Sequence, residues 1–114
     1  MAKSHDEIWD QFNDAVNMTP KELKSWLDTD ESKSVGDTGG DGESTGHESG
    51  RKILDIKDTK KADLSDDQWA WMNKVVGYVN RHCAQVPKDP EGSKWEYSLK
   101  NWGHDPMKKG GCAN

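Results

Sequence analysis

Apolar residues recur at helical spacing in several separate segments of the chain. In residues 4–17 an apolar stripe begins at Ile8 and ends at Val16. Apolar positions three and four residues apart are typical of one face of an α-helix. Ser4 or Asp6 can accept a hydrogen bond from the first turn and so cap the segment. The pattern predicts a first helix over about residues 4–17.

The clearest start signal in the chain lies at Thr19. Pro20 follows it, at a helix position where the missing N–H has no cost, and Glu22 is placed to complete a capping box. An apolar face follows this signal. We expect a second helix that begins here and fades near residues 28–30.

A glycine-rich segment comes next. Residues 34–50 contain six glycines, whose backbone entropy opposes regular structure. We predict a mobile loop over about residues 35–43 and an ordered approach over 44–50. A third helix is expected from Gly50 to about Lys57.

The longest predicted helix begins at a second capping box, formed by Ser65 and Gln68. Apolar residues then follow the helical repeat over about residues 65–85, until Pro87 stops the pattern. A last helix is predicted over about residues 92–102.

No segment shows the alternation of a strand, so the predicted fold is all-α. We expect a small bundle of four to five short helices, with the glycine-rich loop between helices 2 and 3. Residues 1–106 form a single helical domain in this interpretation, and residues 107–114 form a disordered tail. The expected core consists of Trp9, Phe12, Leu23, Trp26, Leu27, Ile53, Leu54, Trp69, Met72, Val75, Val76, Val79, Trp95, Leu99 and Trp102.

Composition limits the size of this core. Of the 114 residues, 31% are hydrophobic and 32% charged, but six are tryptophans, and each tryptophan can bury about 150–250 Å². The net charge of −5 is uneven, because residues 1–50 carry −8 and residues 51–114 carry +3. There is no membrane-length apolar run and no export signal. We expect a small, acidic, intracellular protein, cytoplasmic or nuclear.

The two cysteines and four histidines show no metal-binding spacing. His82 and Cys83 are adjacent on a helix, so they point about 100° apart, and His82 is interpreted as a partly buried core residue. A reducing compartment would leave Cys83 and Cys112 as free thiols, with a disulfide between them as the alternative. No phosphate-binding loop or nucleophile motif is present. The sequence therefore predicts no metal, no cofactor and no enzymatic activity.

Basic residues gather in the C-terminal half. Lys74 and Arg81 are seven residues apart, on one face of the long predicted helix, and acidic residues interleave the basic ones. Basic side chains on one face neutralise nucleic-acid phosphates. Trp71 lies off the main apolar stripe, so it either packs against a second helix or is exposed for contact. The candidate phosphate contacts outside the long helix are Lys33, Arg51, Lys52, Lys57, Lys60 and Lys61.

Five sequence segments, in this order, resemble the DUF3140 family. They are MTPKEL at 18–23, ESKSVG at 31–36, GHESGR at 46–51, KVVGYV at 74–79 and SLKNWGHDP at 98–106. The resemblance implies a small bacterial or fungal protein of unknown function, and it supplies no catalytic residues. Some members carry the label DNA-binding protein, and some are associated with small Tudor-like domains.

A shorter stretch is similar to the SAP motif, in which a helix, an extended loop and a second helix bind duplex DNA. The similar segments are residues 22–27 and 49–54, although the intervening loop is longer and acidic here. This resemblance places Ser49, Gly50, Arg51 and Lys52 at the start of the second helix. Backbone N–H groups there could hold a phosphate, and an ordinary helix entry is the alternative.

We therefore expect a non-enzymatic DNA-binding module, associated with chromatin or stress, that contacts phosphates through a basic helix start and loop. The alternative is a protein-interaction adaptor whose acidic N-terminal half binds a basic partner. A small-molecule site is the third alternative, and it would require a deep pocket.

Overall fold

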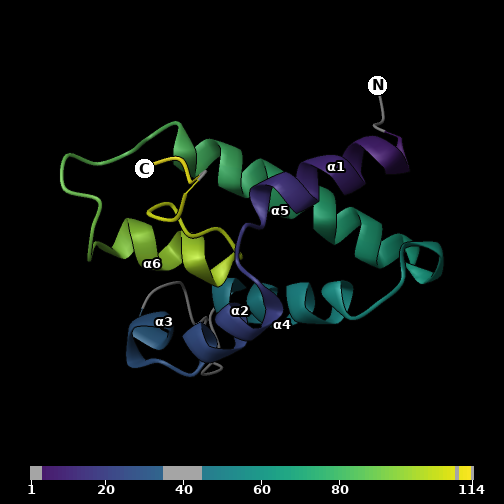
Figure 1. The fold of residues 1–114 in the computed structure, drawn as a ribbon, viewed down its shortest axis with the longest axis horizontal. Coiled ribbons are helices and arrows are strands. Elements are labelled where there is room, and N and C mark those ends of the chain that lie inside the picture. Colours follow the sequence, from purple (N-terminus) through teal and green to yellow (C-terminus); the bar gives the residue numbers. More distant parts are fainter. Residues whose placement is uncertain (1–3, 35–44, 110, 114) are drawn as a thin grey trace.

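The computed structural model describes residues 4–34, 45–109 and 111–113 (Figure 1). These ranges contain helices and turns but no strand, which confirms the all-α fold. Within them, no helix is both long and apolar enough to cross a membrane. The elements are α1 (His5–Ala15), α2 (Pro20–Leu27), α3 (Asp30–Ser34), α4 (Thr45–Lys57), a 3-10 turn (Lys61–Asp63), α5 (Asp66–Cys83) and α6 (Lys94–Asn101).

Both predicted capping boxes are present. The Thr19 hydroxyl accepts from the Glu22 N–H at 3.1 Å, and the Glu22 carboxylate accepts from the Thr19 N–H at 2.9 Å. Ser65 and Gln68 repeat the arrangement at 3.1 and 2.9 Å. Each box satisfies two N–H groups that a helix start leaves unpaired. Local sequence therefore fixes where α2 and α5 begin.

Two predictions around the glycine-rich segment are wrong. A short helix, α3, follows α2, so the glycine-rich segment connects α3 to α4 rather than the second helix to the third. Helix α4 begins at Thr45, so residues 45–50 are its first turns and not an approach to it. The predicted mobile loop over 35–43 lies outside the described residues.

The helices form two packed pairs, α1 with α5 and α2 with α4, and α6 joins them. Figure 1 shows α1 lying along α5, and α2 beside α4, while α6 contacts α2, α3, α4 and α5. Most of the predicted core is confirmed, but four of its members are only partly buried: Trp9, Trp26, Leu54 and Trp95. Among the described residues, five buried apolar residues lie outside the predicted core list: Ile8, Ala15, Val16, Met18 and Ile56.

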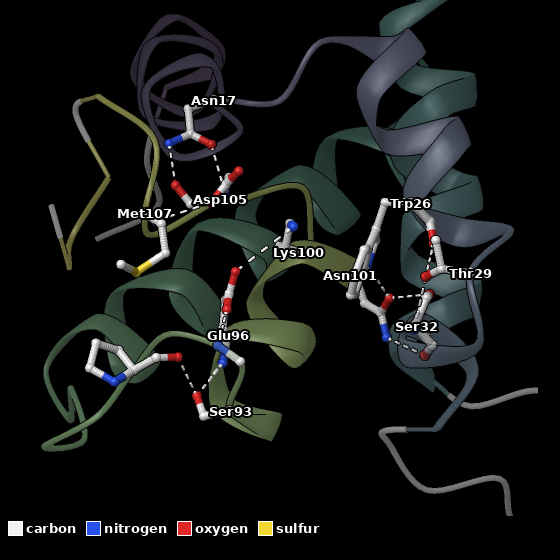
Figure 2. Close-up of polar contacts among 12 residues, drawn as sticks. Asn17, Trp26, Thr29, Ser32, Ser93, Glu96, Lys100, Asn101, Asp105 and Met107 are labelled. Carbon is white, nitrogen blue, oxygen red and sulfur yellow. Dashed lines mark hydrogen bonds and ion pairs between the residues drawn. The ribbon is translucent and has the colours of Figure 1, made fainter.

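Asn101, at the end of α6, joins three helices through one buried amide (Figure 2). Its Oδ1 accepts from Trp26 Nε1 at 2.8 Å and from Ser32 Oγ at 2.5 Å. Its Nδ2 donates to the Ser32 carbonyl at 3.1 Å. Thr29 adds a hydroxyl that accepts from the Ser32 N–H. These bonds give the short α3 a tertiary anchor that its own length does not supply.

Helix α4 approaches α2 and α6 closely at Gly50. A Cβ built on Gly50 would lie 2.7 and 2.9 Å from the two methyl carbons of Leu27, and 2.9 Å from the main-chain oxygen of Asn101. Only a residue without a side chain fits at these distances. The glycine is therefore a packing requirement in the middle of a helix.

The C-terminal segment, predicted as a disordered tail from residue 107, contacts the rest of the chain through residues among 107–109 and 111–113. Asn17 donates to the Asp105 carbonyl at 3.0 Å and accepts from the Asp105 N–H at 2.7 Å (Figure 2). Lys108 forms an ion pair with Glu22 of α2 at 2.5 Å. These contacts fasten the segment to the α1–α2 connection.

The same segment returns to the end of α5. Cys112 forms a disulfide with Cys83, with their Cα atoms 5.7 Å apart, so the expectation of two free thiols is wrong and the alternative is confirmed. The Ala113 N–H donates to the Pro106 carbonyl at 2.9 Å. A Cβ on Gly111 would collide with the main-chain oxygens of Asp105 and Pro106. The tight turn that brings Cys112 back therefore depends on this glycine.

Candidate functional site

A hollow of about 580 Å³ lies between α4 and α5. Two lysines from different helices converge in it on one tryptophan. The Nζ of Lys52 is 3.9 Å, and that of Lys74 4.6 Å, from the centroid of the Trp71 ring. The remaining lining residues are Asp55, Ile56, Asp67, Gln68 and Ala70.

Trp71 is the end of a column of stacked rings. It lies nearly parallel to Trp102, with centroids 6.0 Å apart, and Trp102 stacks on Tyr78 at 4.0 Å. Tyr78 stacks in turn on His82, whose partly buried position is confirmed and lowers the pKa of its imidazole. The Trp71 Nε1–H donates to Ser49 Oγ at 3.1 Å. Packing therefore fixes the ring, while one part of it lines the hollow.

The charges in the hollow are mixed. Lys52 also forms an ion pair with Glu48 at 3.4 Å, and both side chains are about half exposed. Asp55 and Asp67 bring two carboxylates to the same walls. An exposed ion pair contributes about 0–1 kcal/mol, and an exposed cation–π contact about 0.5–1 kcal/mol. Such contacts are weak enough for an incoming anion to displace, so the Lys52 ammonium group can still bind one.

The predicted phosphate cradle at Ser49 and Gly50 is absent. Both residues lie inside α4, beyond its start at Thr45, so their N–H groups are not the unpaired ones of a helix start. Ser49 is fully buried and bonded to Trp71, and Gly50 is buried against α2 and α6. The sequence at 49–52 resembles a helix start. It does not show that helical turns precede it, although α4 already begins at Thr45.

Lys57 and Lys61 hold α1 instead of forming an open basic patch. Lys57 Nζ donates to Asn13 Oδ1 at 2.9 Å, and its burial lowers the pKa of the ammonium group. Lys61 pairs with Asp6 at 2.7 Å, and this hydrogen bond holds the pKa of the Asp6 carboxyl below its ordinary value. Each ammonium group also lies 5.4 Å from the centroid of an aromatic ring of α1.

The other predicted lysines and arginine are exposed but dispersed. Lys33 belongs to α3, Arg51 to α4, and Lys60 to the connection before the 3-10 turn. None of the three lines the hollow at Trp71. The structure places Lys52 and Lys74 at the same ring, a convergence that the sequence did not predict because the two residues lie 22 positions apart on different helices.

A second hollow, of about 270 Å³, was not predicted. Cys83, His104 and Cys112 line it, and one ligand-type atom from each lies within 4.8 Å of the other two. His104 Nδ1 is 2.7 Å from the Ala15 carbonyl, and Nε2 accepts from the Cys112 N–H at 3.3 Å. Separations of 21 and 8 residues match no common motif, so no sequence signal pointed to this cluster.

Comparison with known proteins places the chain in a family. The model of DUF3140, described as a protein of unknown function, matches residues 11–100. This range runs from α1 into α6 and includes the hollow at Trp71. No curated protein and no solved structure matches the chain. Because the match covers well over half of its residues, the chain belongs to the DUF3140 family of proteins of unknown function.

Proposed function

We propose that this chain is a small DNA-binding module without catalytic activity, and that it binds phosphates at the hollow between α4 and α5. The observation that carries the proposal is the convergence of Lys52 and Lys74 on the fixed ring of Trp71. Two ammonium groups close together suit adjacent phosphates, because neutralising phosphates releases counterions and provides most of the non-specific affinity. A tryptophan edge beside them offers an apolar contact to sugars or to unpaired bases.

The acidic neighbours set the strength of this interaction. Asp55 and Asp67 line the same hollow and oppose an anionic ligand. We therefore expect weak binding that depends on few phosphates. Two phosphate contacts give a salt slope of about −1.8, which is roughly a 12-fold loss of affinity between ~50 and ~200 mM salt.

Fluorescence anisotropy with a labelled DNA duplex at those two salt concentrations tests the proposal. The informative variant is Lys52→Ala/Lys74→Ala, and its matched control is Lys21→Ala/Lys88→Ala, which changes the net charge equally at exposed positions outside the hollow. We expect the first pair to remove most of the salt slope of about −1.8, and the control pair to leave most of it. Asp55→Asn should tighten binding.

Two results would reject this assignment. One is the absence of duplex binding by the unmodified chain at ~50 mM salt, where phosphate contacts are strongest. The other is an equal loss of affinity in the two double variants, because net charge alone would then explain the binding.

A specific feature of α1 supports the second candidate, a protein-interaction adaptor. Between His5 and Ala15 the helix contains four acidic residues and no lysine or arginine, and Glu7 and Asp10 are exposed on it. Complementary charge would direct a basic partner to this face. Binding of a labelled lysine-rich peptide, compared between the unmodified chain and Glu7→Gln/Asp10→Asn, tests it. Equal binding by both would exclude α1 as the contact.

A further inference from the structure

The end of α5 and the segment after α6 bring together three side chains that commonly bind metals. Cys83 is the last residue of α5, while His104 and Cys112 lie in the C-terminal segment. The two sulfur atoms and one imidazole nitrogen all lie within 4.8 Å of one another. A tetrahedral zinc ion, with bonds of about 2.3 Å to sulfur and 2.0 Å to nitrogen, holds its ligand atoms roughly 3.5–3.8 Å apart. Once the disulfide is open, the three ligand atoms of the chain are therefore close to the spacing that such an ion requires.

The orientation of His104 is the second observation. Its Nδ1 lies 2.7 Å from the Ala15 carbonyl, which can only accept, so Nδ1 carries the proton. The lone pair is then on Nε2, which faces Cys112 and accepts its N–H at 3.3 Å, so an ion bound to Nε2 replaces this long hydrogen bond. An imidazole that donates one N–H to a main-chain carbonyl and directs the other nitrogen at an ion is the usual arrangement of a zinc ligand.

The surroundings allow an ion to enter. Cys83 and Cys112 are partly exposed, and His104 is buried beneath them. The hollow of about 270 Å³ reaches all three residues. The hollow is open to solvent at the two cysteines, so a water molecule can supply the fourth ligand. Thiolate and imidazole ligands favour zinc over magnesium or calcium.

We propose that the reduced chain binds one Zn²⁺ through Cys83, Cys112 and His104 Nε2, and that this site and the disulfide are alternative states of the same residues. A dithiol reductant opens the Cys83–Cys112 bond by supplying two electrons and two protons, and is itself oxidised to a disulfide. Zinc then displaces the two thiol protons and binds both thiolates. The site lies on α5 and the C-terminal segment, outside the hollow at Trp71, so it does not depend on the proposed DNA contact.

Titration with Co²⁺ and then Zn²⁺ tests this inference. The full chain is reduced with a phosphine, freed of excess reductant and titrated with Co²⁺. A thiolate-to-cobalt charge-transfer band together with visible bands of tetrahedral Co²⁺ should saturate at one ion per chain. Zn²⁺ should then abolish both bands, because zinc binds such sites more tightly than cobalt. The unreduced chain should give no thiolate band.

Variants locate the ligands. Cys112→Ser should weaken zinc binding by about 100-fold or more, because a three-ligand site loses a thiolate. His82→Gln is the matched control, because His82 is next to Cys83 in sequence but stacks on Tyr78, and it should bind as the unmodified chain does. His104→Gln removes the imidazole ligand, and circular dichroism establishes whether this variant is folded. If it is not, the Cys112→Ser result decides the question.

Two outcomes would overturn the inference. The first is a reduced chain that remains folded and shows no thiolate band with equimolar Co²⁺. The second is zinc affinity that is unchanged in Cys112→Ser, because the ion would then be bound elsewhere.

Discussion

Replacing Gly50 with alanine tests the close contact of α4 with α2 and α6. Alanine in the middle of a helix is favoured over glycine by about 0.8–1 kcal/mol. Against this, the new Cβ would lie 2.7 Å from a Leu27 methyl carbon and 2.9 Å from the Asn101 main-chain oxygen. Carbon contacts are optimal at about 3.5–4.0 Å, and overpacking a core typically costs about 1–3 kcal/mol. Because a backbone atom must move, we expect the upper part of that range, and a net loss of about 1–2 kcal/mol.

Gly77 provides a matched control in α5. A Cβ there would meet the end of the flexible Arg81 side chain at 3.4 Å, and nothing closer. Gly77→Ala should therefore gain the helix preference of about 0.8–1 kcal/mol. The two variants make the same chemical change in two helices. Gly50→Ala should lower the free energy of unfolding and Gly77→Ala should raise it, so the two values should differ by roughly 2–3 kcal/mol.

Urea unfolding followed by circular dichroism measures this difference. Equal slopes with different midpoints would indicate a change of stability alone. In thermal unfolding the same difference corresponds to roughly 10 °C between the two variants. Should Gly50→Ala unfold at the same urea concentration as Gly77→Ala, the tight crossing of α4 over α2 and α6 would be refuted.

Two further predictions concern polar contacts. Asn101→Ala should lower the free energy of unfolding by roughly 2–4 kcal/mol, because the Trp26 N–H and the Ser32 hydroxyl lose a buried acceptor. A loss below about 1 kcal/mol in urea unfolding would contradict the role of Asn101 in joining α2, α3 and α6. The hydrogen bond from Lys108, with a second from the Thr19 N–H, lowers the pKa of Glu22 from 4.5 to about 2. These contacts of the Glu22 carboxylate therefore stabilise the fold fully above pH 4.5 and lose their effect as the pH falls towards 2. The ion pair contributes less than about 1 kcal/mol, because its side chains are 34% and 46% exposed. Glu22→Gln should remove that part of the pH dependence, and an unchanged acid-unfolding curve would contradict it.

The sequence predicted best what short-range hydrogen bonds decide. The boxes at Thr19 and Ser65 name their own partners three residues ahead, so the starts of α2 and α5 were confirmed. Helix α3 was missed because its anchor is Asn101, 69 residues from Ser32. The start of α4 was misplaced for a related reason. Gly50 in isolation opposes helix, and only its contacts with Leu27 and Asn101 explain its presence inside one.

The candidate sites, like α3 and the start of α4, depend on contacts between residues that are distant in sequence. The sequence indicated that Lys52 is a candidate phosphate contact and that Trp71 lies off the main apolar stripe of its helix. Only the packing of α4 against α5 places the two residues together. The cysteine and histidine cluster gave no local signal. Its geometry follows from the turns at Gly103, which has a φ of +82°, and at Gly111. Those turns return the chain to the end of α5.

The reciprocal bonds between Asn17 and Asp105 also set an order of events during synthesis. The two residues are 88 positions apart, and translation adds about 5–20 residues per second, so Asn17 waits roughly 4–18 s for its partner. Met18 waits as long for the Gly103 carbonyl, which accepts from its N–H at 3.2 Å. Helix α5 ends at Cys83 and is made within that interval, so the apolar side of α1 lacks its α5 partner for the first part of it. A nascent chain paused before residue 66, where α5 begins, would therefore expose the apolar side of α1 to chaperones, even though α2 and α4 could already have paired.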